Sequence, residues 1–297
     1  MAHVIGAFFV AVCFAWVAGI ARADAETCAS LSSVTSSVES SVSVVVEQAQ
    51  VEYVYDGDTL RLSDGRKVRL LGINTPELAR PAKGSRPEQP AQPLADEAAA
   101  AVSRWLQAPS SRVQLLVGRE REDRYGRLLA HVFNQRGQSL EASLLQQGLA
   151  FMVVIPPNTR HAECYQQLEV QARRQQLGIW SHPAWQPVAA KTVVAQGKTG
   201  FLRVKGTVTR IDQARDLWIE LDHALVLRVS GANHHEISRD FVADWLKRSL
   251  VVRGWVTRRK LSNSLKAKGF KEFVMTVKSP YAFERDRFSQ KNDLFGG

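Results

Sequence analysis

The chain has 297 residues and a formal net charge of +10, with a pI near 9.8. This length is sufficient for two domains that each bury a core, and the basic character favours an anionic partner. The sequence contains neither a glycine-rich phosphate loop nor a Cys-x-x-Cys pair, which argues against nucleoside-triphosphate and zinc chemistry.

The N-terminus has the pattern of an export signal. Residues 4–20 form an uninterrupted apolar run, and Ala21-Arg22-Ala23 supplies small residues at alternate positions, as a signal peptidase requires. We therefore expect residues 1–23 to be a signal peptide and the protein to be exported, either periplasmic or secreted. Because no Lys or Arg precedes the apolar run, an uncleaved membrane anchor is the alternative.

The cysteine count points to one disulfide. Cleavage after residue 23 would remove Cys13 and leave Cys28 and Cys164 as the only two cysteines of the mature chain. In an oxidising compartment such a pair is expected to form a bridge. The alternative is two unrelated thiols, with Cys164 buried in a helix.

The first domain is expected to span residues 47–182. Residues 24–46 are rich in Ser and Val and are predicted to be a flexible linker. A meander of three strands follows, at residues 51–55, 59–62 and 67–71, with a hairpin turn at 63–66. Four prolines between residues 78 and 93 predict a long surface loop.

A helix and two further strands complete the barrel pattern. Residues 94–106 carry an apolar stripe at helical spacing, and two strands are expected at 113–117 and 128–133, with His131 facing outward. Helices are expected at about 139–147 and 159–176. Five short strands with a helix after the third indicate an OB-fold five-stranded barrel with three helices, a mainly β fold with α elements.

A second unit is expected after an interdomain linker at residues 183–198. The five expected strands lie at 201–208, 217–221, 224–229, 250–256 and 272–277, and a helix is expected near 239–248. This pattern predicts a small OB-like basic domain over residues 199–284, followed by a tail at 285–297. Residues 197–297 contain 20 Lys and Arg against 11 Asp and Glu, so most of the positive charge lies here.

Asp56 and Asp58 are the first candidate site residues. They flank Gly57 at the end of a strand, so this turn can direct both carboxylates toward one cation. In an ordinary Asp-Gly turn the same acids would only cap backbone amides.

The end of the next strand favours the cation site. Arg69 lies within that strand, and Asn74, Thr75 and Glu77 follow at its end. The hairpin can fold these residues back onto Asp58, and Pro76 restricts the backbone between Thr75 and Glu77. Carbonyl and carboxylate oxygens are the ligands that calcium prefers.

Arg127 is the second candidate phosphate ligand. It follows Tyr125-Gly126 at the start of a strand, and an arginine fork suits bidentate contact with phosphate oxygens. A solvated arginine in a β-turn is the other interpretation of this motif taken alone. Acids that hold a cation beside two arginines suit phosphodiester cleavage, which requires charge neutralisation and an oriented water.

Residues from about Val51 to Trp180 resemble the staphylococcal nuclease (thermonuclease) family. The strings that carry the resemblance occur in the family order and are D-G-D-T at 56–59, R-L-L-G-I-N-T-P-E at 69–77, D-R-Y-G-R at 123–127, G-L-A at 148–150, P-N-T at 157–159 and G-I-W at 178–180. The resemblance implies an OB-fold phosphodiesterase that acts on DNA and RNA with calcium and leaves 3′-phosphates.

The resemblance also implies roles for individual residues. The metal ligands would be Asp58, Asn74 and the carbonyl of Thr75. The catalytic residues would be Arg69 and Arg127, which clamp the phosphate, and Glu77, which orients or deprotonates the water. Tyr125 would lie beside the phosphate or sugar, and Lys83 and Arg124 are our further expected substrate contacts.

Three features depart from the family pattern. Asn74 stands where the best-known member of the family has an aspartate ligand, which predicts weaker calcium affinity with the mechanism retained. Residues 151–155 lack the tyrosines that pack on the terminal nucleotide, so mononucleotide inhibitors should bind poorly. The loop at 78–93 differs in sequence, and Lys83 or Arg86 is expected to contact substrate there.

Two functions therefore stay open. The first is an exported, calcium-dependent nuclease whose basic C-terminal domain contacts nucleic acid through residues such as Arg253, Arg258 and Arg259, interleaved with Trp255, Phe270 and Phe273. In the alternative for that domain, its basic hairpin is solvated and its aromatic residues form a core. The second function is a non-catalytic nucleic-acid-binding protein on a degenerate nuclease fold. No stable protein partner is predicted.

Overall fold

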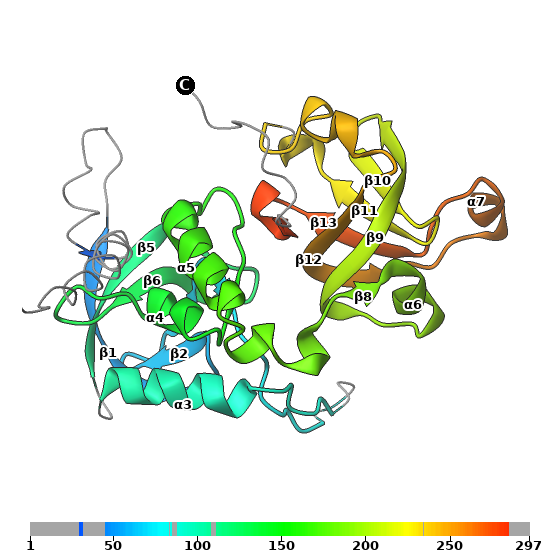
Figure 1. Ribbon diagram of the computed structural model, residues 1–297. Coiled ribbons are helices and arrows are strands. Elements are labelled where there is room, and N and C mark those ends of the chain that lie inside the picture. Colours follow the sequence, from blue (N-terminus) through cyan, green and yellow to red (C-terminus); the bar gives the residue numbers. More distant parts are fainter. Residues whose placement is uncertain are drawn as a thin grey trace, which may run out of the picture.

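The computed structural model describes residues 30–31, 45–82, 84, 88–107, 111–233 and 235–284. The expected signal peptide, the tail at 285–297, Cys28, Lys83 and Arg86 lie outside the described residues. Figure 1 shows two bodies, one coloured blue to green and the other yellow to red. Within the described residues, no helix combines the length and the apolar composition that crossing a membrane requires.

The first body is a closed five-stranded barrel. Its strands are β1 (Val46–Val54), β2 (Thr59–Leu62), β3 (Lys67–Leu70), β5 (Arg112–Glu122) and β6 (Leu128–Phe133), joined in the order β1-β2-β3-β6-β5. The β3–β6 pair is parallel and the other pairs are antiparallel. Inward-facing Leu60, Leu62, Val68 and Leu70 are buried in the barrel. The predicted three-strand meander and OB topology are therefore confirmed.

Three helices pack on this barrel, as expected. They are α3 (Ala95–Leu106), α4 (Leu140–Gln146) and α5 (Ala162–Arg174). Ser139 caps α4 by accepting a hydrogen bond from the Ala142 amide. α5 begins three residues later than predicted, because His161 has a positive φ of 62° and breaks the helical path before Ala162.

Within residues 151–155, which lack the family's tyrosines, the structure forms only a short strand. β7 contains only Phe151–Met152 and pairs with β4 (Ile73–Asn74), with Phe151 opposite Asn74. This two-residue pairing connects the chain before α5 directly to the segment that follows β3. It therefore helps to position the end of β3, where the candidate site residues lie.

The prediction that His131 faces outward is wrong. His131 is buried, and its Nδ1 lies 3.0 Å from the hydroxyl oxygen of Tyr165. α4 and α5 cover the face of β6 that the prediction for His131 left exposed to solvent. Burial lowers the pKa of His131 and raises the pKa of the neighbouring Glu141 to about 8, so burial favours the neutral form of both side chains.

The second body is also a closed five-stranded barrel. Its strands are β9 (Gly200–Gln213), β10 (Leu217–Leu221), β11 (Leu225–Val229), β12 (Ser249–Arg258) and β13 (Phe273–Val277). They follow the order β9-β10-β11-β13-β12 with closure between β12 and β9, and β11 and β13 are parallel. The same strand order and the same parallel pair occur in the first barrel.

Two details of the second barrel differ from expectation. The helix predicted near 239–248 is a 3₁₀ segment, Asp240–Trp245, in which Val242 is buried and Phe241 and Trp245 pack partly buried against the barrel core. A short helix that was not predicted, α7 (Asn263–Ala267), lies between β12 and β13. It is capped by Ser262, whose hydroxyl accepts a hydrogen bond from the Leu265 amide.

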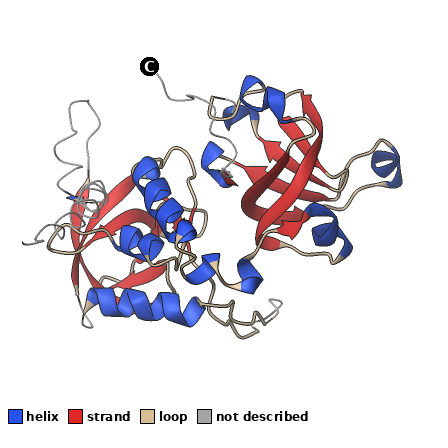
Figure 2. Cartoon of the chain, viewed as in Figure 1, coloured by secondary structure: helices blue, strands red, loops and turns tan. Residues whose placement is uncertain are grey.

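The segment expected to be an interdomain linker is folded. It contains a 3₁₀ turn (Pro183–Trp185), β8 (Val188–Ala189) and α6 (Ala190–Ala195), and α6 is visible at the lower edge of the second barrel in Figure 2. The indole of Trp185 donates a hydrogen bond to the carbonyl of Pro93, and its ring packs 5.3 Å from the ring of Phe151. Because Trp185 is buried against the first barrel, this segment attaches the barrels and does not separate them.

Buried ion pairs join the two barrels. Arg253 on β12 lies 2.7 Å from Glu169 on α5, and both side chains are buried. Glu284 in β14 (Phe283–Glu284) accepts two hydrogen bonds of 2.6 Å from Arg203 and lies 3.3 Å from Arg173 on α5. Burial acts to raise the pKa of Glu284, but the hydrogen bonds from Arg203 act against it, and the pKa lies below its ordinary value.

Candidate active site

The turn between β1 and β2 places Asp58 at the end of β4. The Asp58 side chain is only 4% exposed. Its Oδ2 accepts a hydrogen bond from the Thr75 amide at 2.9 Å, and its Oδ1 accepts one from the Thr59 hydroxyl at 3.2 Å. Gly57 is required here, because a Cβ at this position would lie 2.7 Å from the side chain of Thr75. The turn and the end of β4 are therefore in direct contact.

Arg69 joins the same group from β3. Its Nη2 lies 3.1 Å from Asp58 Oδ2 and 3.3 Å from Asn74 Oδ1. Its Nη1 donates hydrogen bonds to the carbonyls of Leu70 and Ile73. The expected phosphate ligand is thus held beside the expected metal ligands, and its charge offsets that of Asp58.

Asp56 and Glu77 lie close enough to Asp58 for its negative charge to raise their pKa values. Burial, and then the charge of Asp58, raise the pKa of Asp56 to about 7. The same two causes raise the pKa of Glu77, against the opposing charges of Arg80, Arg69 and Arg127. Because these carboxylates destabilise one another when they are ionised, a bound cation would be favoured at this position.

Arg127 is oriented by Asp123 in the turn before β6. Its Nε and Nη2 lie 2.8 and 2.7 Å from Asp123 Oδ2, and its backbone amide donates to Asp123 Oδ1. Its Nη1 donates to the Thr59 hydroxyl at 3.3 Å, and that hydroxyl in turn donates to Asp58. Thr59 therefore links the two sides of the site.

Tyr125 and Arg124 lie on the outer edge of this group. The Tyr125 side chain is 68% exposed, with the guanidinium of Arg124 4.8 Å and that of Arg127 5.7 Å from its ring centroid. Arg124 also donates a hydrogen bond of 2.7 Å to the Tyr125 hydroxyl. Both expected substrate contacts are thus accessible beside Arg127.

The oxygen atoms near Asp58 suit calcium better than a transition metal. Among the described residues, no three His, Cys, Asp or Glu side chains gather closely enough to hold a metal ion by themselves. The candidate ligands are instead one carboxylate, the Asn74 amide oxygen and the Thr75 carbonyl, and calcium accepts such mixed oxygen ligands completed by water. The buried Thr75 hydroxyl has no hydrogen-bond partner, which leaves one more oxygen in this group.

Three supporting residues were not singled out from the sequence. Thr59 and Asp123 connect and orient the arginines, and Arg80 pairs with Glu77 at 3.0 Å. Thr59 and Asp123 lie inside the D-G-D-T and D-R-Y-G-R strings, so their closeness in sequence to the predicted site residues could have identified them. Arg80 lies in the proline-rich loop, where no sequence pattern indicates which residues lie near the site.

This barrel and this site define the class of protein: the chain belongs to the staphylococcal nuclease family. Residues 67–182 match the family described as staphylococcal nuclease homologue. The chain is 34% identical to a thermonuclease of Staphylococcus intermedius over 145 residues, which are 48% of this chain and 81% of the relative. It is 33% identical to a thermonuclease of Staphylococcus hyicus over 43% of this chain and 73% of the relative.

An endonuclease of Bacillus subtilis has a similar sequence identity over a smaller share of its own length. The SPbeta prophage-derived endonuclease YokF of Bacillus subtilis (strain 168) is 30% identical over 159 residues, which are 52% of this chain and 49% of the relative. The chain is therefore a homologue of nucleases. The matched family region ends at residue 182, before the second barrel begins.

Proposed function

We propose that this protein is an exported, calcium-dependent nuclease that hydrolyses phosphodiester bonds of DNA and/or RNA and leaves 3′-phosphate products. The observation that carries the proposal is one connected set of contacts. Arg69 is paired with Asp58, and Arg127 reaches the same carboxylate through Thr59. Two guanidinium groups and an acidic cation site thus adjoin one another, as charge neutralisation on a phosphoryl group requires.

The mechanism assigns a separate task to each side chain. Arg127, oriented by Asp123, stabilises charge on the phosphoryl oxygens, and Arg69 does the same from the side of Asp58. Glu77 orients or deprotonates the water that attacks opposite the leaving 5′ oxygen. Asp58, Asn74 and the Thr75 carbonyl would hold calcium, which when bound supplies further positive charge to the phosphoryl oxygens.

The direct test is cleavage of single-stranded DNA by the purified protein, with calcium and with a chelator. We expect cleavage only with calcium, and fragments that a polymerase cannot extend until a phosphatase removes their 3′-phosphates. Retention of DNA on the protein without cleavage would instead support the non-catalytic alternative. The same assay with RNA of the same sequence measures the preference between the two substrates.

Asn74→Asp is expected to lower the calcium concentration needed for half-maximal activity. The substitution adds a carboxylate beside Asp58 and gives Arg69 a charged partner where it now contacts an amide oxygen. Calcium affinity rises with the number of charged ligands. The measurement is a calcium titration of the cleavage rate, with Asn134→Asp in the exposed turn after β6 as the control. An unchanged half-maximal concentration would show that residue 74 is not a ligand.

Export and the disulfide between Cys28 and Cys164 form one proposal. The described residues nearest Cys28 support it: the Leu31 amide donates to the Gly137 carbonyl, and Leu31 packs on Phe133. The Phe133 ring lies 6.1 Å from that of His161, the N-cap residue of α5, and Cys164 is buried in the first turn of that helix. Leu31, three residues after Cys28, therefore lies near the helix end that carries Cys164.

Thiol titration of denatured, unreduced exported protein tests this disulfide. We expect no free thiol before reduction and two after it, together with an N-terminus at Asp24. Two free thiols before reduction would exclude the bridge. An N-terminus that retains the apolar run would support the membrane-anchored alternative.

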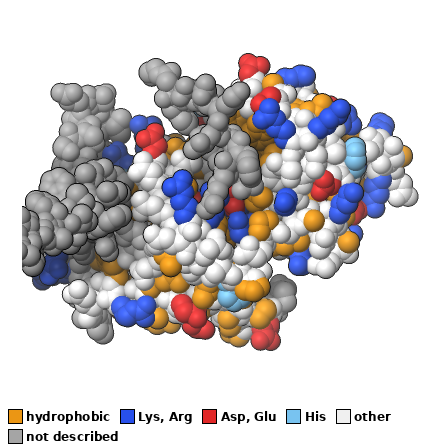
Figure 3. Space-filling view, viewed as in Figure 1, with side chains coloured by type: hydrophobic (Ala, Val, Ile, Leu, Met, Phe, Trp, Pro, Cys, Tyr) orange, Lys and Arg blue, Asp and Glu red, His pale blue; other side chains and the backbone are white. Residues whose placement is uncertain are grey.

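The second barrel is proposed to contact nucleic acid, through a smaller set of residues than the sequence suggested. Phe273 is 3% exposed and Arg253 is 5% exposed, so neither can contact an extended strand, because the barrel core and the interdomain contact bury them. The candidate that remains is a stack in which half-buried Arg259 lies 5.4 Å from the half-buried Trp218 ring and 5.9 Å from the exposed Phe270 ring. Lys and Arg side chains are spread over this barrel on the face seen in Figure 3.

Arg259→Ala is expected to weaken binding of single-stranded DNA and to lower the salt dependence of log K by about one unit, as the loss of one phosphate contact predicts. A point substitution is preferable to removing the barrel, because removal would expose the Phe151 and Trp185 contact. Arg258→Ala is the control, since Arg258 is already paired with Glu272. Equal salt slopes for the two variants would remove Arg259 from the interface.

A further inference from the structure

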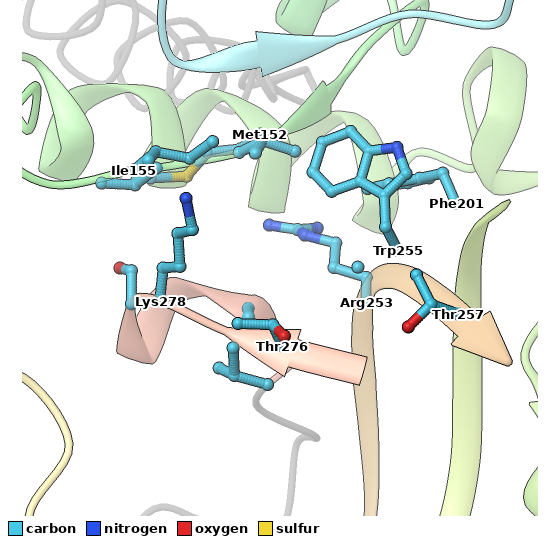
Figure 4. Close-up of a pocket in the computed structure, with 14 residues that line it drawn as sticks. Met152, Ile155, Phe201, Arg253, Trp255, Thr257, Thr276 and Lys278 are labelled. Carbon is cyan, nitrogen blue, oxygen red and sulfur yellow. The ribbon is translucent and has the colours of Figure 1, made fainter. Parts of the chain in front are cut away.

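A cavity of about 220 Å³ lies between the two barrels and is not part of the proposed cleavage site. One wall is the segment from Met152, at the end of β7, to Ile155. The opposite wall is formed by β12 and the end of β13 (Figure 4). Most of the lining side chains are apolar, and a few polar groups converge on the space. This composition is typical of a site for a small organic ligand.

Arg253 supplies the polar anchor of this cavity. Its Nη2 lies 2.7 Å from Glu169 and donates to the Tyr281 carbonyl, whereas its Nε and Nη1 are buried without a hydrogen-bond partner. Figure 4 shows the guanidinium extending from β12 toward Met152. Buried donors without partners are costly, and each of these two N–H groups could donate to an oxygen of a bound anion such as a phosphate.

Lys278 and Trp255 complete the arrangement. Figure 4 shows the Lys278 side chain extending toward Met152 and Ile155, on the same side of the cavity as Arg253. Within the described residues, no ion pair holds the Lys278 ammonium. Trp255 is 42% exposed and is fixed by edge-to-face contact with Phe201, with ring centroids 5.0 Å apart. An unpaired cation and an aromatic wall thus accompany the two free donors.

We propose that this interdomain cavity binds a mononucleotide, with its phosphate on Arg253 and Lys278 and its base against Trp255. A volume of about 220 Å³ limits the cavity to one small ligand and excludes a duplex. The identity of the ligand rests on the proposed function, since cleavage that leaves 3′-phosphates would release nucleotides with a terminal phosphate. The cleavage site itself is expected to bind mononucleotides poorly, so the two sites are separable by measurement.

The position of the cavity connects it with the cleavage site. Phe201, which lines the cavity, packs 5.2 Å from Phe151, and Phe151 is the strand partner of Asn74. Glu169, the acid paired with Arg253, also accepts a hydrogen bond from the Met152 amide at 2.7 Å. An occupied cavity would therefore press on the strand pair that positions a candidate metal ligand. The bound product would thereby affect the same barrel that releases it.

Calorimetric titration of the full-length protein with 3′-thymidine monophosphate, in the presence of a chelator, tests the proposal. We expect saturable binding of one ligand, and at least about tenfold weaker binding of thymidine and of inorganic phosphate, because each lacks a contact worth about 1.4 kcal/mol. Equal affinity for inorganic phosphate would overturn the assignment of a nucleotide. No saturable binding at millimolar nucleotide would overturn the site altogether.

Two variants locate the bound ligand. Arg253→Lys retains a cation beside Glu169 but removes the two free donors, and Lys278→Ala removes an exposed side chain without disturbing the barrel core. We expect each variant to bind the nucleotide about tenfold more weakly, because each loses one charge-assisted contact worth about 1.4 kcal/mol. Lys191→Ala, on the exposed side of α6, is the control and should bind as the unmodified protein does.

Cleavage assays with calcium on the same preparations separate the two proposals. Nuclease activity without nucleotide binding would overturn the cavity assignment alone. If binding is unchanged in both Arg253→Lys and Lys278→Ala but is lost in Arg127→Ala, the ligand binds at the cleavage site. This result would also overturn the cavity assignment. Nucleotide binding without nuclease activity would leave the cavity site intact and overturn the proposed function.

Discussion

Replacing Arg127 with alanine is expected to lower kcat/KM for single-stranded DNA by about 10³-fold, the loss typical of removing a donor aimed at developing charge. Asp123 holds this guanidinium through two contacts below 3 Å, and Thr59 connects it to Asp58. The side chain is therefore oriented before substrate binds, and alanine removes both the charge and its placement. Glu77→Ser is expected to cause a loss of similar size by removing the group that orients the water.

Two further variants separate the effect of charge from the effect of geometry. Arg127→Lys retains the cation but cannot contact Asp123 and Thr59 through a planar fork, so we expect it to lie much closer to alanine than to arginine in activity. Arg136→Ala, in the exposed turn after β6, is the control and should leave the rate unchanged. Cleavage that survives both Arg127→Ala and Glu77→Ser would move the active site elsewhere.

Glu169→Ala is expected to destabilise the protein by about 3–5 kcal/mol, the usual cost of leaving one member of a buried ion pair without its partner. Arg253 would then be buried with the Tyr281 carbonyl as its remaining contact, and the Met152 amide would lose its acceptor as well. Burial, with a smaller contribution from the charge of Glu284, raises the pKa of Glu169, and the charge of Arg253 opposes this rise.

Urea denaturation at pH 7 measures this effect, with Glu163→Ala as the control. Glu163 is an exposed glutamate on the same helix, so its substitution should change the free energy of unfolding little. Combining Glu169→Leu with Arg253→Met removes both charges, and this double variant should be more stable than Glu169→Ala. If Glu169→Ala and Glu163→Ala unfold at the same urea concentration, the pair does not stabilise the contact between the barrels.

The elements that were predicted most accurately are those whose signals are local. The strands at 59–62 and 217–221 have the predicted bounds, because alternating side chains bounded by turn residues define a short strand without reference to the rest of the chain. The same holds for the candidate site. Asp58, Thr75 and Arg69 come together because a single hairpin separates them, and the D-G-D-T and D-R-Y-G-R strings bring their supporting residues with them.

Contacts between distant segments could not be predicted in this way. His131 alternates outward along its strand, and only the packing of α4 and α5 shows that both faces of β6 are covered. Trp185 has the surroundings of a linker residue in the sequence, yet it is buried against Phe151. Arg253 belongs to a basic segment that resembles an open nucleic-acid surface, whereas its partner Glu169 lies on a helix of the other barrel.

The sequence by itself determined two OB-type barrels, the family of the first and the identity of the residues at its acidic and basic site, since periodicity, turns and short motifs are encoded by neighbouring residues. Only the tertiary structure decided how the barrels join, which arginine is removed from solvent and where a cavity forms between them. Burial is a property of what covers a residue, and the covering groups come from segments far away along the chain.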